Sequence, residues 1–417
     1  MDRTKAPKIR DVKSIAILPP KEYSLKNGGK LYHLSEIDDD AVKIDLIFDA
    51  GSSRHNKLVS QLTSDLLFSG TPQKTSDAIE ESIDRLGGFT NIEVSADDCI
   101  VSVLGLKEHI LKILEIVTDA IEHVEFNERE FKQTLAYQKQ KFNVNMEKVS
   151  TLARREFISA VFPSSPYGEL TNESDFGQLN KNDLYAFHKE HYLKSLQKVA
   201  IVGDINEALI EKVIDLTSRF GYQNRANDNF SFDYEPKKID NKKEGSLQTA
   251  IRIGRILFNK NHDDFIDFNV LNTILGGYFG SRLMSSIRED KGYTYGIGSG
   301  VAQLMETGYF FISTEVGEEY RDLTISAIKE EIERLQNELV SEEELSLVKN
   351  YITGQLLKNA DGPFAQMDRF LSVEKYGKDL SYYNEFLDKL KIITPERIQE
   401  LANSYLNWKD LIIVKAG

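Results

Sequence analysis

Cysteine is almost absent from this chain, which has a single one, Cys99, among 417 residues. One thiol cannot form an intrachain disulfide, and so little cysteine is typical of proteins in a reducing compartment. Cys99 lies in a strand-like run, and the sequence shows no partner that would make it a nucleophile. We therefore expect it to be packed in the interior.

Long apolar runs are also missing. No stretch approaches the roughly 18 consecutive apolar residues of a membrane-spanning helix. Residues 1–20 carry scattered charges, and the apolar stretch 14–18 is too short for the core of a secretion signal. We expect a cytoplasmic protein without a membrane partner, or a periplasmic one if a leader has been removed.

Basic residues are outnumbered by acidic ones, 52 to 66, which gives a formal charge of −14 at pH 7. Proteins that bind nucleic acid neutralise its phosphates with basic surfaces. The charge therefore argues against nucleic acid as a partner and suits basic or neutral ones. Hydrophobic residues make up 41% and charged residues 28% of the chain, as in ordinary globular proteins.

The two halves of the chain repeat the same signals at an offset of 214 residues. Helix-start signals at Asn127 and Ser341 have this spacing, and so do the helical stretches 180–187 and 394–401. Each helix of the second pair leads to a tyrosine, and a short apolar strand follows that tyrosine in both halves. Equal offsets at two places indicate an internal repeat.

Each half opens with strands and continues with long helices, which indicates an α+β fold. The polar run 224–245 is the expected linker between an N-terminal domain, residues 1–223, and a C-terminal domain, residues 246–417. Strands are expected over 14–18, 30–34, 42–49, 90–104, 248–258 and 296–315.

The most informative stretch covers residues 58–71 and ends in FSGT. This ending resembles the F-x-G-T that follows H-x-x-E-H in the pitrilysin and mitochondrial processing peptidase family of zinc metallopeptidases, the inverzincins. In that motif two histidines bind zinc and the glutamate activates water. Here the three positions hold Gln61, Ser64 and Asp65.

None of these three residues replaces what the family has. The Gln61 amide is a poor zinc ligand, and Ser64 has no basicity at neutral pH. Asp65 is a single carboxylate, whereas zinc sites need at least three protein ligands. The degenerate motif therefore predicts that this chain carries no zinc.

The resemblance implies one more ligand, a glutamate on a later helix, within residues 126–142. Around the expected place, near Gln140, the chain has the run QKQK, residues 138–141. We expect Lys139 and Lys141 to crowd the ligand position, where ammonium groups would repel a dication. A second region thus predicts the same loss of the metal site.

The second half keeps a more complete signature. GGYFGSRL, residues 276–283, and IREDKGYTY, residues 287–295, resemble the family segment in which an arginine and a tyrosine seven residues later bind the substrate backbone. That spacing selects Arg288 and Tyr295. Both side chains can donate hydrogen bonds to a peptide carbonyl and to the oxyanion that forms when water attacks it. Without the resemblance, a structural role describes the pair better, with the arginine at a helix end and the tyrosine packed on a sheet.

A helix ending near Arg288, a turn through 290–292 and a strand from Tyr293 would bring the two side chains to one wall. The glycines at 276–280 are not a phosphate-binding loop, because no Lys-Ser/Thr follows and helical periodicity precedes them. His188 and His191 lack a third ligand, and we expect both to be structural.

The resemblance implies two similar halves, each an antiparallel-rich sheet with helices layered on one face, joined into a clam-like chamber. It also implies a homologous partner chain with intact H-x-x-E-H that carries the zinc. This chain would be a non-catalytic subunit, inactive alone and without a cofactor, whose Arg288 and Tyr295 contact peptide substrates bound to the partner.

Two alternatives stay open. One is a structural member of the family with no part in catalysis, and the other is a stand-alone peptidase with an unrecognised site. The retained Arg288 and Tyr295 favour the peptidase subunit over the structural member. The stand-alone peptidase is the least favoured, because no nucleophile paired with a base stands out and G-x-S-x-G does not occur.

Overall fold

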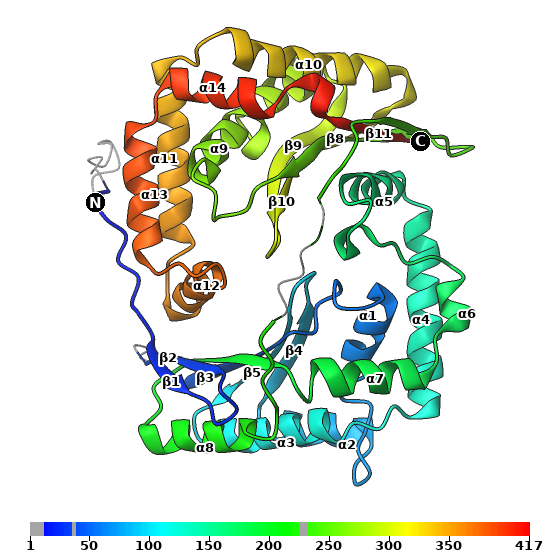
Figure 1. Ribbon diagram of the computed structural model, residues 1–417, viewed down its shortest axis with the longest axis vertical. Helices are drawn as coiled ribbons and strands as arrows, with labels where there is room; N and C mark the ends of the chain where they lie inside the picture. The colour runs from blue at the N-terminus through cyan, green and yellow to red at the C-terminus, as the bar shows by residue number, and fades with distance from the viewer. Residues whose placement is uncertain (1–11, 36–38, 226–229, 231) are drawn as a thin grey trace, which may run out of the picture.

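The computed structural model describes residues 12–35, 39–225, 230 and 232–417. Two α+β halves each contain one mostly antiparallel sheet (Figure 1). The first sheet has the order β1-β2-β6-β3-β5-β4. Its strands are β1 (Lys21–Ser24), β2 (Lys30–Leu34), β3 (Ala41–Phe48), β4 (Phe89–Val94), β5 (Cys99–Leu106) and β6 (Leu196–Val202).

The second sheet has the order β7-β11-β8-β10-β9, and β7 and β11 run parallel. Its strands are β7 (Lys238–Asn241), β8 (Gln248–Leu257), β9 (Thr294–Gln303), β10 (Gly308–Gly317) and β11 (Ile412–Ala416). Edge strand β9 follows the segment that carries Arg288, so the candidate site lies at the border of this sheet.

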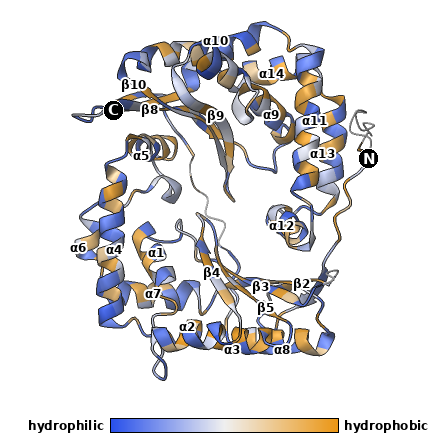
Figure 2. Cartoon of the chain, turned by 180° about the vertical axis from the view of Figure 1, so that it is seen from behind, coloured by the Kyte–Doolittle hydropathy of each residue, from blue (hydrophilic) through white to orange (hydrophobic). Residues whose placement is uncertain are grey.

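Helices cover the outer face of each sheet. In the first half α3 and α8 bury Ile113, Val117 and Val213 against the strands, and both are coloured largely apolar in Figure 2. The helices of this half are α1 (Lys57–Asp65), α2 (Ser76–Asp84), α3 (Ile110–Glu122), α4 (Glu128–Met146), α5 (Val149–Val161), α6 (Asp175–Gln178), α7 (Lys181–His191) and α8 (Glu207–Thr217).

In the second half, Ile328 and Leu401 are buried in the same core as Ile253 and Ile312 of the sheet. The helices are α9 (Phe265–Asn272), the π-helical turns η2 (Thr273–Gly277) and η3 (Met284–Asp290), α10 (Arg321–Asn337), α11 (Glu342–Lys358), α12 (Pro363–Glu374), α13 (Ser381–Ile392) and α14 (Pro395–Tyr405). The predicted α+β class with two similar halves is confirmed.

Helix caps confirm the repeat. Asn127 and Ser341 cap α4 and α11, and their side chains accept backbone N–H groups of the first turn. Asn180 and Thr394 do the same for α7 and α14. Each cap satisfies an N–H group that has no partner within the helix, so these signals act locally and are readable in the sequence.

Two corresponding helices are exchanged between the halves, which the sequence did not predict. α5 of the first half packs Ala153 and Phe157 with Val414 of the second sheet. α12 of the second half packs Met367 with Tyr32 and Ala200 of the first sheet, and both crossings are visible in Figure 1. The face of each sheet that its own helices leave uncovered is therefore partly covered by the other half.

One expected strand is wrong, and the predicted linker contains a strand. Residues 14–18 form no strand but an extended segment on the second half, where Ile15 N donates to Asn384 Oδ1 (3.0 Å) and Leu18 N to Gln366 Oε1 (3.0 Å). The end of the predicted linker forms β7, whose alternating polar residues suit an edge strand as well as a loop. Linker residues 226–229 and 231 lie outside the described part.

None of the helices in the described ranges combines the length and the apolar content that crossing a bilayer requires.

Candidate functional site

The degenerate motif lies on α1, which starts at the cap Asn56 and is held by the buried residues Leu58 and Leu62. This packing turns Gln61 and Asp65, one helical turn apart, to the exposed side. Ser64 points inward and is fully buried.

Asp65 is held by two amides. Gln61 Nε2 donates to Asp65 Oδ1 at 2.8 Å, and Gln138 Nε2 of α4 donates to Asp65 Oδ2 at 2.5 Å. Zinc sites use thiolate, imidazole or carboxylate ligands, and this set offers one carboxylate whose two oxygens are both occupied. The residues present therefore do not fit a zinc ion. Over the part of the chain that the structure describes, no three His, Cys, Asp or Glu side chains form a group that could hold a metal.

The structure places the position of the missing ligand two residues before the predicted one, at Gln138. Gln138 meets the motif, not Gln140, and Lys139 makes an ion pair with Glu173 at 3.3 Å instead of facing the site. Helical spacings of three and four place Gln138 on the face of α4 that carries Phe131, Leu135 and Phe142, but only the packing of α4 on α1 brings that face to Asp65.

Ser64 belongs to a buried cluster of neutral groups. Its Oγ donates to Ser60 O at 2.8 Å and lies 2.7 Å from Tyr192 Oη, so the phenol donates to the serine. Burial raises the pKa of the neighbouring Cys99 to about 11 and raises the pKa of Tyr192 well above its usual value. A base that activates water is therefore absent from this position, and Cys99 is packed as predicted.

This cluster gives a stability prediction. Tyr192→Phe leaves Ser64 Oγ without a donor and should lower the free energy of unfolding by about 1 kcal/mol. The double variant Tyr192→Phe, Ser64→Ala should lose less free energy of unfolding than the two single variants together. In the double variant neither hydroxyl of the pair is left without its partner. Urea denaturation of the four proteins measures this, and strictly additive costs would contradict the hydrogen bond.

The histidine pair has the structural role that we expected. His188 Nε2 lies 2.6 Å from Ile121 O, and His191 Nδ1 lies 2.8 Å from Asp49 O. Burial lowers the pKa of both imidazoles, so both are neutral donors to backbone carbonyls.

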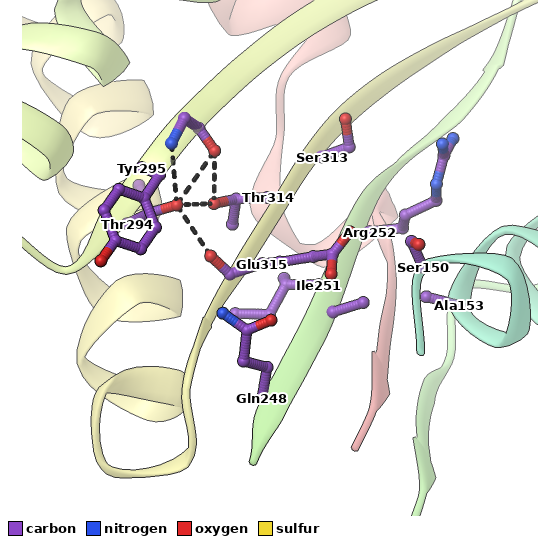
Figure 3. A pocket seen from close by; sticks show the side chains of 12 residues that line it. Ser150, Ala153, Gln248, Ile251, Arg252, Thr294, Tyr295, Ser313, Thr314 and Glu315 are labelled. Carbon is purple, nitrogen blue, oxygen red and sulfur yellow. Dashed lines mark hydrogen bonds between the residues drawn. The ribbon is translucent and has the colours of Figure 1, made fainter. Parts of the chain in front are cut away.

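Arg288 and Tyr295 lie on consecutive elements, as the sequence predicted. Arg288 is in η3, a turn with Gly292 at φ +66° follows, and Tyr295 is the second residue of β9. Tyr295 is 95% exposed and lines two cavities, of about 450 and 930 Å³, the smaller of which is drawn in Figure 3.

The structure does not place the two side chains in one cavity. Arg288 stacks on Phe279, with its guanidinium 4.8 Å from the ring centroid, and lies 3.8 Å from the Glu289 carboxylate. It is not among the residues lining either Tyr295 cavity within the described ranges. That both contact one peptide remains a prediction.

Two threonines near Tyr295 belong to the site although the sequence did not predict them. Thr294 Oγ1 donates to Glu315 O (2.8 Å), and Thr314 Oγ1 lies 2.9 Å from Thr294 Oγ1 (Figure 3). The β9–β10 register shifts at Thr314, so these bonds hold the backbone at an irregular point and aim Tyr295 outward. The only sequence signal was a threonine directly before the tyrosine.

These features define a peptidase-like fold of two halves with a degenerate metal motif. The family model described as Insulinase (Peptidase family M16) matches residues 33–171, and that described as Peptidase M16 inactive domain matches residues 178–352. The chain belongs to peptidase family M16.

Curated relatives span nearly the whole chain. The Bacillus subtilis protein named uncharacterized zinc protease YmxG is 24% identical over 395 residues, which are 92% of this chain and 94% of the relative. The Arabidopsis thaliana protein named probable mitochondrial-processing peptidase subunit beta is 21% identical over 417 residues, covering 94% of this chain and 77% of its own.

Solved structures confirm the fold. A crystal structure titled peptidase M16 inactive domain, from Pseudomonas fluorescens, has a TM-score of 0.87 at 22% identity and covers 96% of this chain and 98% of its own. The crystal structure of a protease from Helicobacter pylori has a TM-score of 0.83 at 17% identity and covers 96% of this chain and 100% of its own.

Proposed function

We propose that this chain is a non-catalytic subunit of a two-chain M16 peptidase and contributes Arg288 and Tyr295 to the active site of a zinc-bearing partner. One contrast carries the proposal. Asp65 of the degenerate motif is tied to two glutamine amides, whereas Tyr295 is 95% exposed beside a cavity. The chain has lost the groups that activate water and keeps one that binds substrate.

The chemistry divides between the two chains. The partner, a homologue with intact H-x-x-E-H, would hold zinc, which supplies an activated water molecule. Tyr295 and Arg288 of this chain would donate to the carbonyl of the peptide, and these bonds strengthen as negative charge develops on its oxygen. The Arabidopsis relative, named as a peptidase subunit, supports a two-chain arrangement.

A structural subunit without a part in catalysis is the second candidate. Arg288 favours it, because its guanidinium already stacks on Phe279 and has Glu289 nearby. For both candidates we propose the cytoplasm as the location, on the ground of the low cysteine content.

Reconstitution tests the proposal. The purified chain should hold no stoichiometric zinc after dialysis and should not cleave a quenched fluorescent peptide, whereas a mixture with a homologue from the same organism that has intact H-x-x-E-H should cleave it. Elemental analysis, the fluorescence assay and gel filtration measure the three properties. A tightly bound equivalent of zinc or cleavage by the chain alone would refute the proposal, and an unchanged rate in a stable complex would support the structural subunit.

A further inference from the structure

Phe279 is a large apolar side chain that lies outside the core. It follows Tyr278, whose backbone is extended, with φ −151° and ψ 171°, and whose ring packs on Tyr351 with the ring centroids 5.0 Å apart. Successive side chains of an extended backbone point to opposite sides. Phe279 therefore points outward, and 64% of it is exposed. At this position its ring meets the guanidinium of Arg288.

Arg288 combines a fixed backbone with a long, partly exposed side chain. Ile287 precedes it in η3 and is completely buried in the core of the second half. The Arg288 side chain is 35% exposed. Holding such a side chain in one rotamer costs conformational entropy. The ring of Phe279, whose centroid lies 4.8 Å from the guanidinium carbon, selects one orientation before any ligand binds.

This contact leaves the guanidinium able to donate hydrogen bonds. An aromatic ring attracts a guanidinium through its π face and does not take up its N–H groups as a carboxylate does. Arg282 of the same signature shows the other arrangement, because its Nε and Nη2 donate to the two Glu344 oxygens at 2.9 and 2.8 Å. The Glu289 carboxylate, 3.8 Å from Arg288 Nη1, is beyond hydrogen-bonding distance. Among the described residues, Arg288 is thus held without being ion-paired as Arg282 is.

We propose that Phe279 is a positioning residue for Arg288, whose guanidinium its ring orients in advance for donation to the carbonyl of the bound peptide. The inference rests on the proposed function for the identity of the acceptor. Phe279 acts through Arg288 alone, by reducing the conformational entropy that this side chain loses when it binds. An arginine bonded like Arg282 would first have to break two hydrogen bonds to a carboxylate.

NMR of the isolated full chain with labelled arginine tests the contact. A ring shifts the signals of nuclei above its face upfield, so the Arg288 side-chain signals, assigned by their loss in Arg288→Lys, should move downfield in Phe279→Leu. They should stay in place in Phe279→Tyr, which keeps the ring. Phe89→Leu on β4 changes a phenylalanine of similar exposure, 62%, and is the matched control. Identical Arg288 signals in the wild type and in Phe279→Leu would overturn the inference.

Kinetics of the reconstituted peptidase test the positioning role. Phe279→Leu should lower kcat/KM about 2- to 5-fold, the factor that corresponds to an exposed cation–π contact. Most of the loss should appear in kcat, because the bond from Arg288 strengthens in the transition state. Phe279→Tyr should keep the wild-type rate, and so should Phe89→Leu. In an Arg288→Ala background Phe279→Leu should have no further effect, which a merely structural role would not produce.

The outcomes separate this inference from the proposed function. If Arg288→Ala lowers the rate and Phe279→Leu does not, Arg288 needs no positioning, so the inference fails while the proposed function stands. A loss in Phe279→Leu that persists in the Arg288→Ala background also overturns the inference, because the ring then acts through another contact. Full activity of Arg288→Ala refutes the catalytic role of Arg288 and this inference together. Thermal melts check folding, and Phe279→Met repeats the test with a second side chain that has no ring.

Discussion

Tyr295→Phe or Arg288→Ala should lower the kcat/KM of the reconstituted peptidase by about 10- to 1,000-fold, since removal of one donor to an oxyanion costs about 100- to 1,000-fold in kcat at most sites studied. The phenol of Tyr295 is almost entirely exposed, and no hydrogen bond occupies it within the described structure. Its hydroxyl is therefore free to donate to a peptide carbonyl, and its loss weakens the transition state more than the bound substrate.

Folding should be nearly unaffected by these changes. Tyr295→Phe removes a hydroxyl from solvent, and Arg288→Ala removes a partly exposed cation–π contact with Phe279, worth about 0.5–1 kcal/mol. Tyr137→Phe, another exposed tyrosine, is the matched control and should leave activity unchanged.

Peptide cleavage, thermal melts and gel filtration of the mixed chains measure these effects. Full activity of both variants in a normal complex would refute the catalytic role. Arg288→Lys adds a further comparison, since it keeps the charge but loses the planar fork and should recover only part of the rate.

Gln61→His, Asp65→His and Gln138→Glu together should create a zinc site. The three side chains already converge, because both amides bond to Asp65. Two imidazoles and a carboxylate are a common catalytic zinc ligand set. We expect the triple variant to bind zinc at least about 100-fold more tightly than the double histidine variant, since even outer-shell partners change metal affinity by about 10- to 100-fold.

The variant that restores only the H-x-x-E-H motif should fail as a peptidase. Gln61→His, Ser64→Glu and Asp65→His leave the third ligand position with Gln138. They also bury a carboxylate against Tyr192, at a cost of several kcal/mol. Zinc titration with a competing chelator and urea denaturation measure the two effects. Strong zinc-dependent cleavage by that variant would show that the backbone of α1 is more accommodating than its packing indicates.

The internal repeat and the degenerate motif were predictable because both depend on signals within one helical turn. Asn127 and Ser341, and Asn180 and Thr394, cap helices through contacts within one turn, so their offset of 214 residues revealed the repeat before any tertiary contact was known. The degenerate motif was equally local, because Gln61 and Asp65 show their chemistry by residue type and one helical turn joins them.

The sequence by itself determined the α+β class, the two halves, the degenerate motif and the order of helix, turn and strand around Arg288 and Tyr295. Tertiary structure alone decided which sheet each amphipathic helix covers, because the pattern of Phe157 or Met367 specifies an apolar face but not its partner. It also decided that Gln138 meets Asp65. These are contacts between residues far apart in the chain, and no local signal carries them.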